Sequence, residues 1–127
     1  MLVFVSLLCR VLRVCSEMWG MPFPNPYMQL YKTSAAALKA VHPSLRVGGP
    51  ATMCLQDAAD FVGNASAMKL PVDFVSTHAY PTDGACIGGY NESDPNGFTN
   101  AILSVRDDVR RSLAAVEYPP APFYMTE

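Results

Sequence analysis

The sequence predicts an α/β fold in which amphipathic helices alternate with short strands that pair into a parallel sheet. Three stretches carry apolar residues at helical spacing, and the short runs between them are mostly apolar. Strands of this type, joined by helical crossovers, form parallel sheets whose faces are covered by helices. Of the 127 residues, 50% are hydrophobic and 16% are charged, which suits one modest packed domain. Doubly wound and barrel folds both satisfy these observations.

The first predicted helix follows a rigid, proline-rich loop at residues 22–26. Asn25 is a suitable N-cap, and Pro26 suits the first helical position. The helix is expected to end at an exposed His42, because the residue before a proline disfavours the α region. Its largely apolar stripe comprises Tyr27, Leu30, Tyr31, Ser34, Leu38 and Val41.

A strand and a second helix come next. Residues 45–47 are predicted to form a short strand that runs into Gly48-Gly49-Pro50, where the glycines permit positive φ in a tight turn. Pro71 separates the second helix from a β-rich run at residues 72–80. The apolar stripe of the second helix comprises Leu55, Ala58, Phe61, Val62, Ala65 and Met68.

The last unit begins with a long loop at residues 81–97, which is rich in glycine and contains an Asn-Gly pair. Thr99 is predicted to cap the third helix, Pro119-Pro120 ends it, and a strand follows at residues 123–125. The stripe of this helix comprises Ile102, Val105, Val109, Leu113 and Val116. A further strand at about residues 11–19 would bring the total to four strands and three helices.

Composition argues against several classes of protein. The formal net charge is -2 and no stretch gathers Lys and Arg on one face, so nucleic acid is not an expected partner. The four cysteines lack CxxC spacing, so no zinc site is expected. Cys54 and Cys86 fall in or near loops and are able to pair in an oxidising compartment. Sequons at Asn64 and Asn91 are compatible with a secreted or lysosomal-like protein without deciding its localisation.

Residues 1–13 are the doubtful part of the chain. No positive charge precedes the apolar run at residues 1–9, and Arg10 and Arg13 interrupt it before any small-residue cleavage site. The run is too short to cross a bilayer, so no membrane partner is expected. A buried strand, a signal peptide and a misplaced start of the reading frame remain open.

The ends of the predicted strands carry the residues suited to chemistry. In barrel enzymes the working residues lie at the carboxyl ends of the strands. Glycoside hydrolysis requires two carboxyl groups facing one sugar, one to protonate the leaving oxygen and one to attack the anomeric carbon. Glu17 and Glu127 are the candidates at such positions.

Three segments resemble glycoside hydrolase family 39, which contains β-xylosidases and α-L-iduronidases. They are LRVGGPAT at residues 45–52, PVDFVSTHAYP at 71–81 and FYMTE at 123–127. The resemblance covers roughly residues 17–127 and implies a (β/α)₈ TIM barrel, of which this chain would hold strands four to seven with the intervening helices. Residues 1–127 are therefore expected to form an incomplete catalytic barrel that lacks strands one to three and strand eight. Such a chain is not expected to be a stable, active monomer, because its sheet edges would be open.

The resemblance implies a retaining mechanism in which Glu127 is the nucleophile and neither a metal nor an organic cofactor takes part. The family pattern at strand four is Glu-x-Trp-Asn-Glu-Pro, and this chain reads EMWGMP from Glu17, so that Met21 replaces the acid/base. A rival register keeps Glu17 as the acid/base but matches nothing else. In a strand Glu17 would lie about 13 Å below Met21, too deep to act with Glu127.

The same register predicts the geometry of the site. Met21 and Glu127 are 106 positions apart (127 minus 21), or about 35 residues for each of three βα units, close to the roughly 31 of a typical barrel. A retaining pair has its carboxyl groups about 5–5.5 Å apart, so the tip of Met21 is expected near Glu127. His78 is expected on the rim between them, and Glu17 deeper in the barrel.

Three further residues are predicted to bind the sugar. His78, at the end of an apolar strand, is suited to bind the sugar or orient the nucleophile, although a buried structural histidine is the alternative. Tyr80 and Trp19 are able to stack on a pyranose ring or to fill the barrel mouth. No Arg or Lys lies at a strand end to bind the carboxylate of iduronate, which favours a β-xylosidase.

The predicted function is therefore a retaining O-glycoside hydrolase, most similar to a β-xylosidase, with a carbohydrate as its partner. Gly20 and Met21 leave open a non-catalytic carbohydrate-binding or vestigial protein. A truncated barrel fragment without activity is the third reading. The sequence makes no prediction of the oligomeric state, the exact sugar or the linkage.

Overall fold

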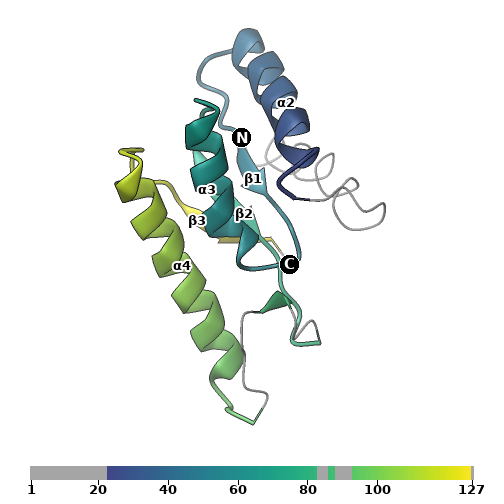
Figure 1. The fold of residues 1–127 in the computed structure, drawn as a ribbon, viewed down its shortest axis with the longest axis vertical. Helices are drawn as coiled ribbons and strands as arrows, with labels where there is room; N and C mark the ends of the chain where they lie inside the picture. The colour runs from purple at the N-terminus through teal and green to yellow at the C-terminus, as the bar shows by residue number, and fades with distance from the viewer. Residues whose placement is uncertain (1–22, 83–85, 88–92, 127) are drawn as a thin grey trace.

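The computed structural model of the protein describes residues 23–82, 86–87 and 93–126. Helices alternate with strands along the chain, and the strands form one parallel sheet in the order β1-β2-β3 (Figure 1). The elements are α2 (Tyr27–Val41), β1 (Gly48–Pro50), α3 (Asp57–Ala67), β2 (Phe74–Thr77), α4 (Gly97–Ala115) and β3 (Phe123–Met125). The predicted alternation and the parallel sheet are confirmed. The doubtful segment 1–13 and the predicted strand at 11–19 lie outside the described residues.

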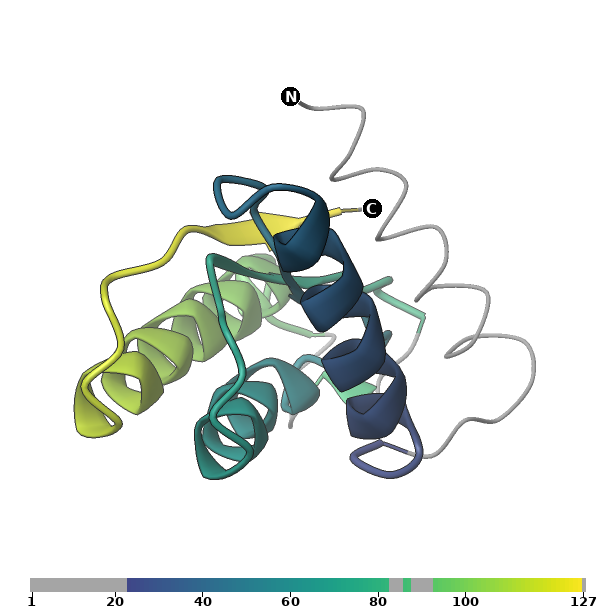
Figure 2. The same ribbon diagram turned by 90° about the horizontal axis from the view of Figure 1, so that it is seen from above.

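The strand register assigns side chains to the two faces of the sheet. Ser76 pairs with Tyr124, and Val75 with Phe123, and paired residues of parallel strands share a face while neighbours along a strand alternate. Val75 belongs to the hydrophobic core and Phe123 packs against it, on the side where α3 and α4 lie next to each other (Figure 2). The opposite face carries Phe74, whose ring contacts that of Tyr124 at a centroid distance of 5.9 Å.

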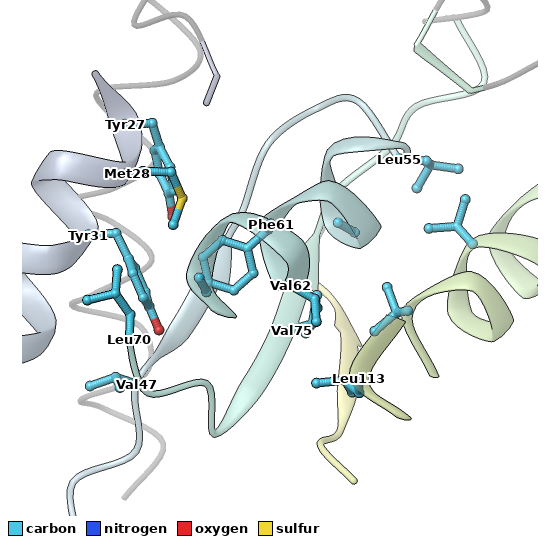
Figure 3. Packing of buried hydrophobic residues seen from close by; sticks show 14 of the residues in the cluster. Tyr27, Met28, Tyr31, Val47, Leu55, Phe61, Val62, Leu70, Val75 and Leu113 are labelled. Carbon is cyan, nitrogen blue, oxygen red and sulfur yellow. The ribbon is translucent and has the colours of Figure 1, made fainter. Parts of the chain in front are cut away.

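The aromatic part of the hydrophobic core lies where α2 meets α3. Tyr31 of α2 packs edge-on against Phe61 of α3, with ring centroids 4.9 Å apart at 88° (Figure 3), an arrangement that aromatic rings favour. The Tyr31 hydroxyl donates a hydrogen bond to the Pro71 carbonyl oxygen at 2.7 Å. Burial raises the pKa of Tyr31 above its ordinary value. The predicted stripe of this helix is correct at Tyr27 and Tyr31 and wrong at Val41, which is 77% exposed because the helix ends there.

The stripes predicted for the other two helices match the buried faces closely. In α3 the buried residues are Ala58, Phe61, Val62 and Ala65, and in α4 they are Gly97, Val105, Val109 and Leu113. Ile102 and Val116 are only half-buried and pack against the edge of the core. No described helix is long and apolar enough to cross a membrane.

Several predicted boundaries are wrong by a few residues. Helix α2 begins at Tyr27, so Pro26 occupies the N-cap position rather than the first helical one. Helix α4 begins at Gly97 instead of after Thr99, because the Asp94 side chain and carbonyl accept the N–H groups of Asn96 and Gly97 and start the helical turn earlier. The first strand is displaced from residues 45–47 to Gly48–Pro50, and the run at 72–80 shortens to Phe74–Thr77.

Helices α3 and α4 end in the same way. The residue after each C-cap has positive φ, 55° at Lys69 and 58° at Glu117, and the following N–H reaches back to a carbonyl oxygen of the last turn. These bonds run from Leu70 to Ala65 (2.9 Å) and from Tyr118 to Leu113 (3.0 Å). This is the Schellman pattern, which satisfies carbonyl groups that a helix end leaves without partners.

Candidate active site at the carboxyl ends of the strands

His78 follows β2 directly and is fully buried. Its N–H donates a hydrogen bond to the Thr52 carbonyl oxygen at 3.1 Å. The alternation of β2 places its side chain on the face of Phe74 and Ser76, away from α3 and α4. Tyr80 is 40% exposed, and its ring centroid lies 6.0 Å from that of His78. Two of the predicted sugar-binding residues are therefore neighbours, one buried and one at the surface.

Hydrogen bonds from threonine side chains join the ends of the three strands. The Thr52 carbonyl oxygen accepts the Thr77 hydroxyl at 2.7 Å as well as the N–H of His78. The Thr77 carbonyl oxygen accepts both the N–H of Thr126 at 2.9 Å and its hydroxyl at 3.1 Å. Sequence reasoning missed these residues, although a threonine at or just after the end of each strand was a visible signal.

The turn after β1 has a different cause from the predicted one. The positive φ belongs to Ala51, at 53°, whose N–H donates to the Ser76 carbonyl oxygen at 2.8 Å. Gly48 and Gly49 are required instead for close packing. A Cβ atom at Gly48 would collide with the backbone and ring of Phe74, and one at Gly49 would collide with the Tyr27 hydroxyl.

The loop that follows β2 is fastened to the loop that follows β1. Cys54 and Cys86, whose pairing the sequence left open, form a disulfide. The N–H of Leu55 donates to the Cys86 carbonyl oxygen at 3.0 Å, and Ile87 is buried in the core. The two loops at this end of the sheet are therefore held together by a covalent bond, a hydrogen bond and apolar contacts.

Asp57, the first residue of α3, lies half-buried beside the same loops. Burial raises the pKa of its carboxyl above the ordinary value, and a hydrogen bond with the Thr52 side chain opposes that shift. The charge of Asp60 adds to the effect of burial. Ionisation of the Asp57 carboxyl is therefore opposed by its partial removal from water.

The remaining predicted site residues, Glu127, Met21, Trp19 and Glu17, lie outside the described residues. The expected approach of Met21 to Glu127, the position of His78 on the rim and the depth of Glu17 therefore stay predictions. Thr126, which precedes Glu127, is anchored to the end of β2 by the two hydrogen bonds above. In the described part of the chain, no group of three or more His, Cys, Asp or Glu is placed to hold a metal ion.

The family model for glycosyl hydrolases family 39 matches residues 18–127. Among curated relatives, a β-xylosidase of Caldicellulosiruptor saccharolyticus is 36% identical over 104 residues, which cover 80% of this chain and 20% of the relative. A β-xylosidase of Geobacillus stearothermophilus is 34% identical over 118 residues, which cover 86% of this chain and 23% of the relative. The chain thus spans about a fifth of the length of these relatives.

Solved structures of the family have a similar fold. A monomeric β-xylosidase from Caulobacter crescentus CB15 is 28% identical with a TM-score of 0.59, covering 95% of this chain and 29% of that one. The family 39 enzyme from Xanthomonas axonopodis pv. citri is 28% identical with a TM-score of 0.56, and the match covers 79% of this chain and 20% of that one. Because the family model matches residues 18–127, this chain belongs to glycosyl hydrolase family 39.

Proposed function

We propose that the chain forms the nucleophile-bearing part of a retaining β-xylosidase barrel, with β1, β2 and β3 as barrel strands five, six and seven. The observation that carries this proposal is the junction of the three strand ends, where Thr52, Thr77 and Thr126 are hydrogen-bonded beside His78. Working residues of barrel enzymes gather at this end of the sheet. Membership of the family and the β-xylosidase names of the relatives support the choice of reaction.

In this proposal Glu127 attacks the anomeric carbon, and the leaving oxygen would normally be protonated from the position that Met21 occupies. A methionine has no proton to donate, so general acid catalysis is absent at that position. The leaving group must then depart without assistance. The chain is therefore suited to glycosides whose leaving groups are already good.

The proposed substrate is an uncharged sugar such as xylose. His78 would contribute hydrogen bonds to the ring hydroxyls, while Tyr80 and Trp19 would stack on the pyranose face. Among the described residues at the strand ends, Thr52, His78, Tyr80 and Thr126, none carries a permanent positive charge. A sugar carboxylate would therefore lack a cationic partner in this part of the site.

Aryl xylosides test the proposal when the chain is joined to the other βα units of a related family β-xylosidase. The joined barrel should hydrolyse a dinitrophenyl xyloside and leave an alkyl xyloside nearly untouched. Met21→Glu combined with Gly20→Asn should restore hydrolysis of the alkyl xyloside. Glu127→Gln should abolish both activities, because no covalent intermediate can form, whereas the exposed Glu117→Gln serves as the matched control.

Two results would contradict this assignment. If Glu17→Gln is as damaging as Glu127→Gln while Met21→Glu changes nothing, Glu17 is the acid/base and the register is wrong. If Glu127→Gln leaves hydrolysis intact, Glu127 is not the nucleophile.

A carbohydrate-binding protein without turnover is the second candidate, and the replacement of both Asn and Glu by Gly20 and Met21 favours it. Such a protein would bind xylobiose in a calorimetric titration and would not release dinitrophenol. Binding would then survive Glu127→Gln and weaken in Tyr80→Ala.

A further inference from the structure

We propose that Thr77 and Thr126 are positioning residues, whose hydroxyl groups hold His78 and Glu127 in the orientation that the sugar site requires. The proposal rests on the function proposed above. It adds two residues that do not themselves touch the substrate.

The first link fixes His78. The Thr52 carbonyl oxygen already accepts the N–H of His78 at 3.1 Å. The Thr77 hydroxyl donates to the same oxygen at 2.7 Å and makes a longer contact of 3.5 Å with the His78 carbonyl oxygen. Two consecutive residues are therefore tied to one acceptor, which restricts rotation of the backbone that carries His78.

The second link has the same form one strand further on. The Thr77 carbonyl oxygen accepts the N–H of Thr126 at 2.9 Å and the Thr126 hydroxyl at 3.1 Å. Both bonds come from the residue that precedes Glu127. A residue held at two points to a neighbouring strand limits the directions in which the next side chain can leave the backbone.

Burial strengthens the bonds between Thr77 and Thr52, whereas Thr126 is half-buried. Thr77 is fully buried and Thr52 is 5% exposed, so water does not compete readily for their polar groups. In such surroundings hydrogen bonds are electrostatically stronger than in water. The Thr77 side chain lies on the helix-facing side of β2, as its pairing with Met125 shows, so it can fix the backbone without occupying the sugar side where His78 lies.

Nuclear magnetic resonance of the joined barrel tests the proposal. Thr77→Val and Thr126→Val keep the shape, the β-branch and the backbone N–H and remove only the hydroxyl. Thr77→Val should shift the imidazole resonances of His78, and Thr126→Val should shift the side-chain carboxyl resonance of Glu127. Thr77→Ser and Thr126→Ser should return both towards the unsubstituted chain. The control is Thr33→Val, whose hydroxyl donates to the Gln29 carbonyl oxygen at 3.1 Å on the exposed side of α2.

The unsubstituted joined barrel offers a measurement that does not depend on the variants folding. The hydroxyl proton of the buried Thr77 should exchange slowly with water and be visible, while that of the exposed Thr33 should exchange rapidly. Rapid exchange at Thr77, or valine variants that leave both reporter resonances unchanged, would overturn the proposal.

Kinetics of the joined barrel separate this proposal from the proposed function. Thr126→Val should lower kcat by about 10- to 100-fold with little change in KM, because small displacements of a reacting group have effects of that size. Thr126→Ser should recover most of the loss. Unchanged kcat in Thr126→Val, with Glu127→Gln inactive, would defeat the positioning role alone. Full turnover in Glu127→Gln would defeat the proposed function instead.

Discussion

The hydroxyl of Tyr118 donates a hydrogen bond to the Leu70 carbonyl oxygen at 2.7 Å. This bond connects the carboxyl ends of α3 and α4, because Leu70 and Tyr118 are the residues that complete the two Schellman endings. Burial raises the pKa of Tyr118 above its ordinary value, as expected for a hydroxyl that is partly withdrawn from water. The two helices that cover the sheet are thus coupled at the end remote from the candidate active site.

Removal of this hydroxyl should weaken the fold. Tyr118→Phe is expected to lower the free energy of unfolding by about 1 kcal/mol, the usual net value of such a bond, as measured by urea denaturation of the joined barrel. Tyr124→Phe is the matched control, because the Tyr124 side chain is 41% exposed and should lose little. Equal effects of the two substitutions would show that the bond to Leu70 does not stabilise the chain.

Glycine at the positive-φ positions should stabilise the helix ends. Lys69→Gly and Glu117→Gly are each expected to raise the free energy of unfolding by roughly 0.5–1 kcal/mol, because glycine adopts this region without the steric cost that an L side chain carries. Ser104→Gly, at an exposed position inside α4, should instead lower the free energy of unfolding by about the same amount. A loss of stability in both Lys69→Gly and Glu117→Gly would contradict the steric argument.

Asp73 should matter more as a backbone acceptor than as an ion-pair partner. Its Oδ2 accepts the Val47 N–H at 2.8 Å and lies 2.7 Å from Lys39 Nζ. Asp73→Ala leaves the Val47 N–H without its acceptor and should lower the free energy of unfolding by about 1–3 kcal/mol. Asp73→Asn keeps an oxygen for that N–H and should cost less. The ion pair is part-exposed, so Lys39→Met should cost under about 1 kcal/mol.

Denaturation midpoints of the three variants decide between the two roles. If Lys39→Met is as harmful as Asp73→Ala, the ion pair rather than the backbone bond dominates.

Local periodicity was sufficient to predict the buried faces of the long helices. Phe61 and Val109 lie in stripes that repeat over several turns, and a 3.6-residue period requires no knowledge of the partner surface. The strands β2 and β3 could be located from their apolar residues, although β2 is shorter than predicted. The alternation of helices and strands then implied a parallel sheet.

Contacts between distant parts of the chain could not be predicted in this way. Gly48 is required by the approach of Phe74, and the Thr77 hydroxyl meets the carbonyl of Thr52, each pair separated by more than twenty residues. No local pattern encodes either contact. The start of α4 was predicted wrongly for a local reason, because the Asp94 side chain begins the turn before Thr99.

The final prediction concerns the pH dependence of folding stability through Asp57. In the folded chain its pKa is raised above the ordinary value of 3.8, chiefly by burial. The folded state therefore holds the carboxyl proton of Asp57 more tightly than the unfolded state does. The contribution of Asp57 to the free energy of unfolding should therefore fall as the pH rises from about 3.8 through the raised pKa, and then level off. Asp57→Asn removes this fall, so the variant should gain stability relative to the unsubstituted chain at pH 7 and gain less at pH 3.5.

Urea denaturation at the two pH values measures that difference directly. Asp60→Asn should act in the same direction but more weakly, since the charge of Asp60 is a smaller contributor to the raised pKa of Asp57. The exposed Glu117→Gln provides the control for the loss of one negative charge. The relative stability of Asp57→Asn must increase with pH, because only the ionised carboxyl of Asp57 carries the desolvation penalty. A variant that gains as much at pH 3.5 as at pH 7 would place the effect in packing or in the Thr52 hydrogen bond rather than in ionisation.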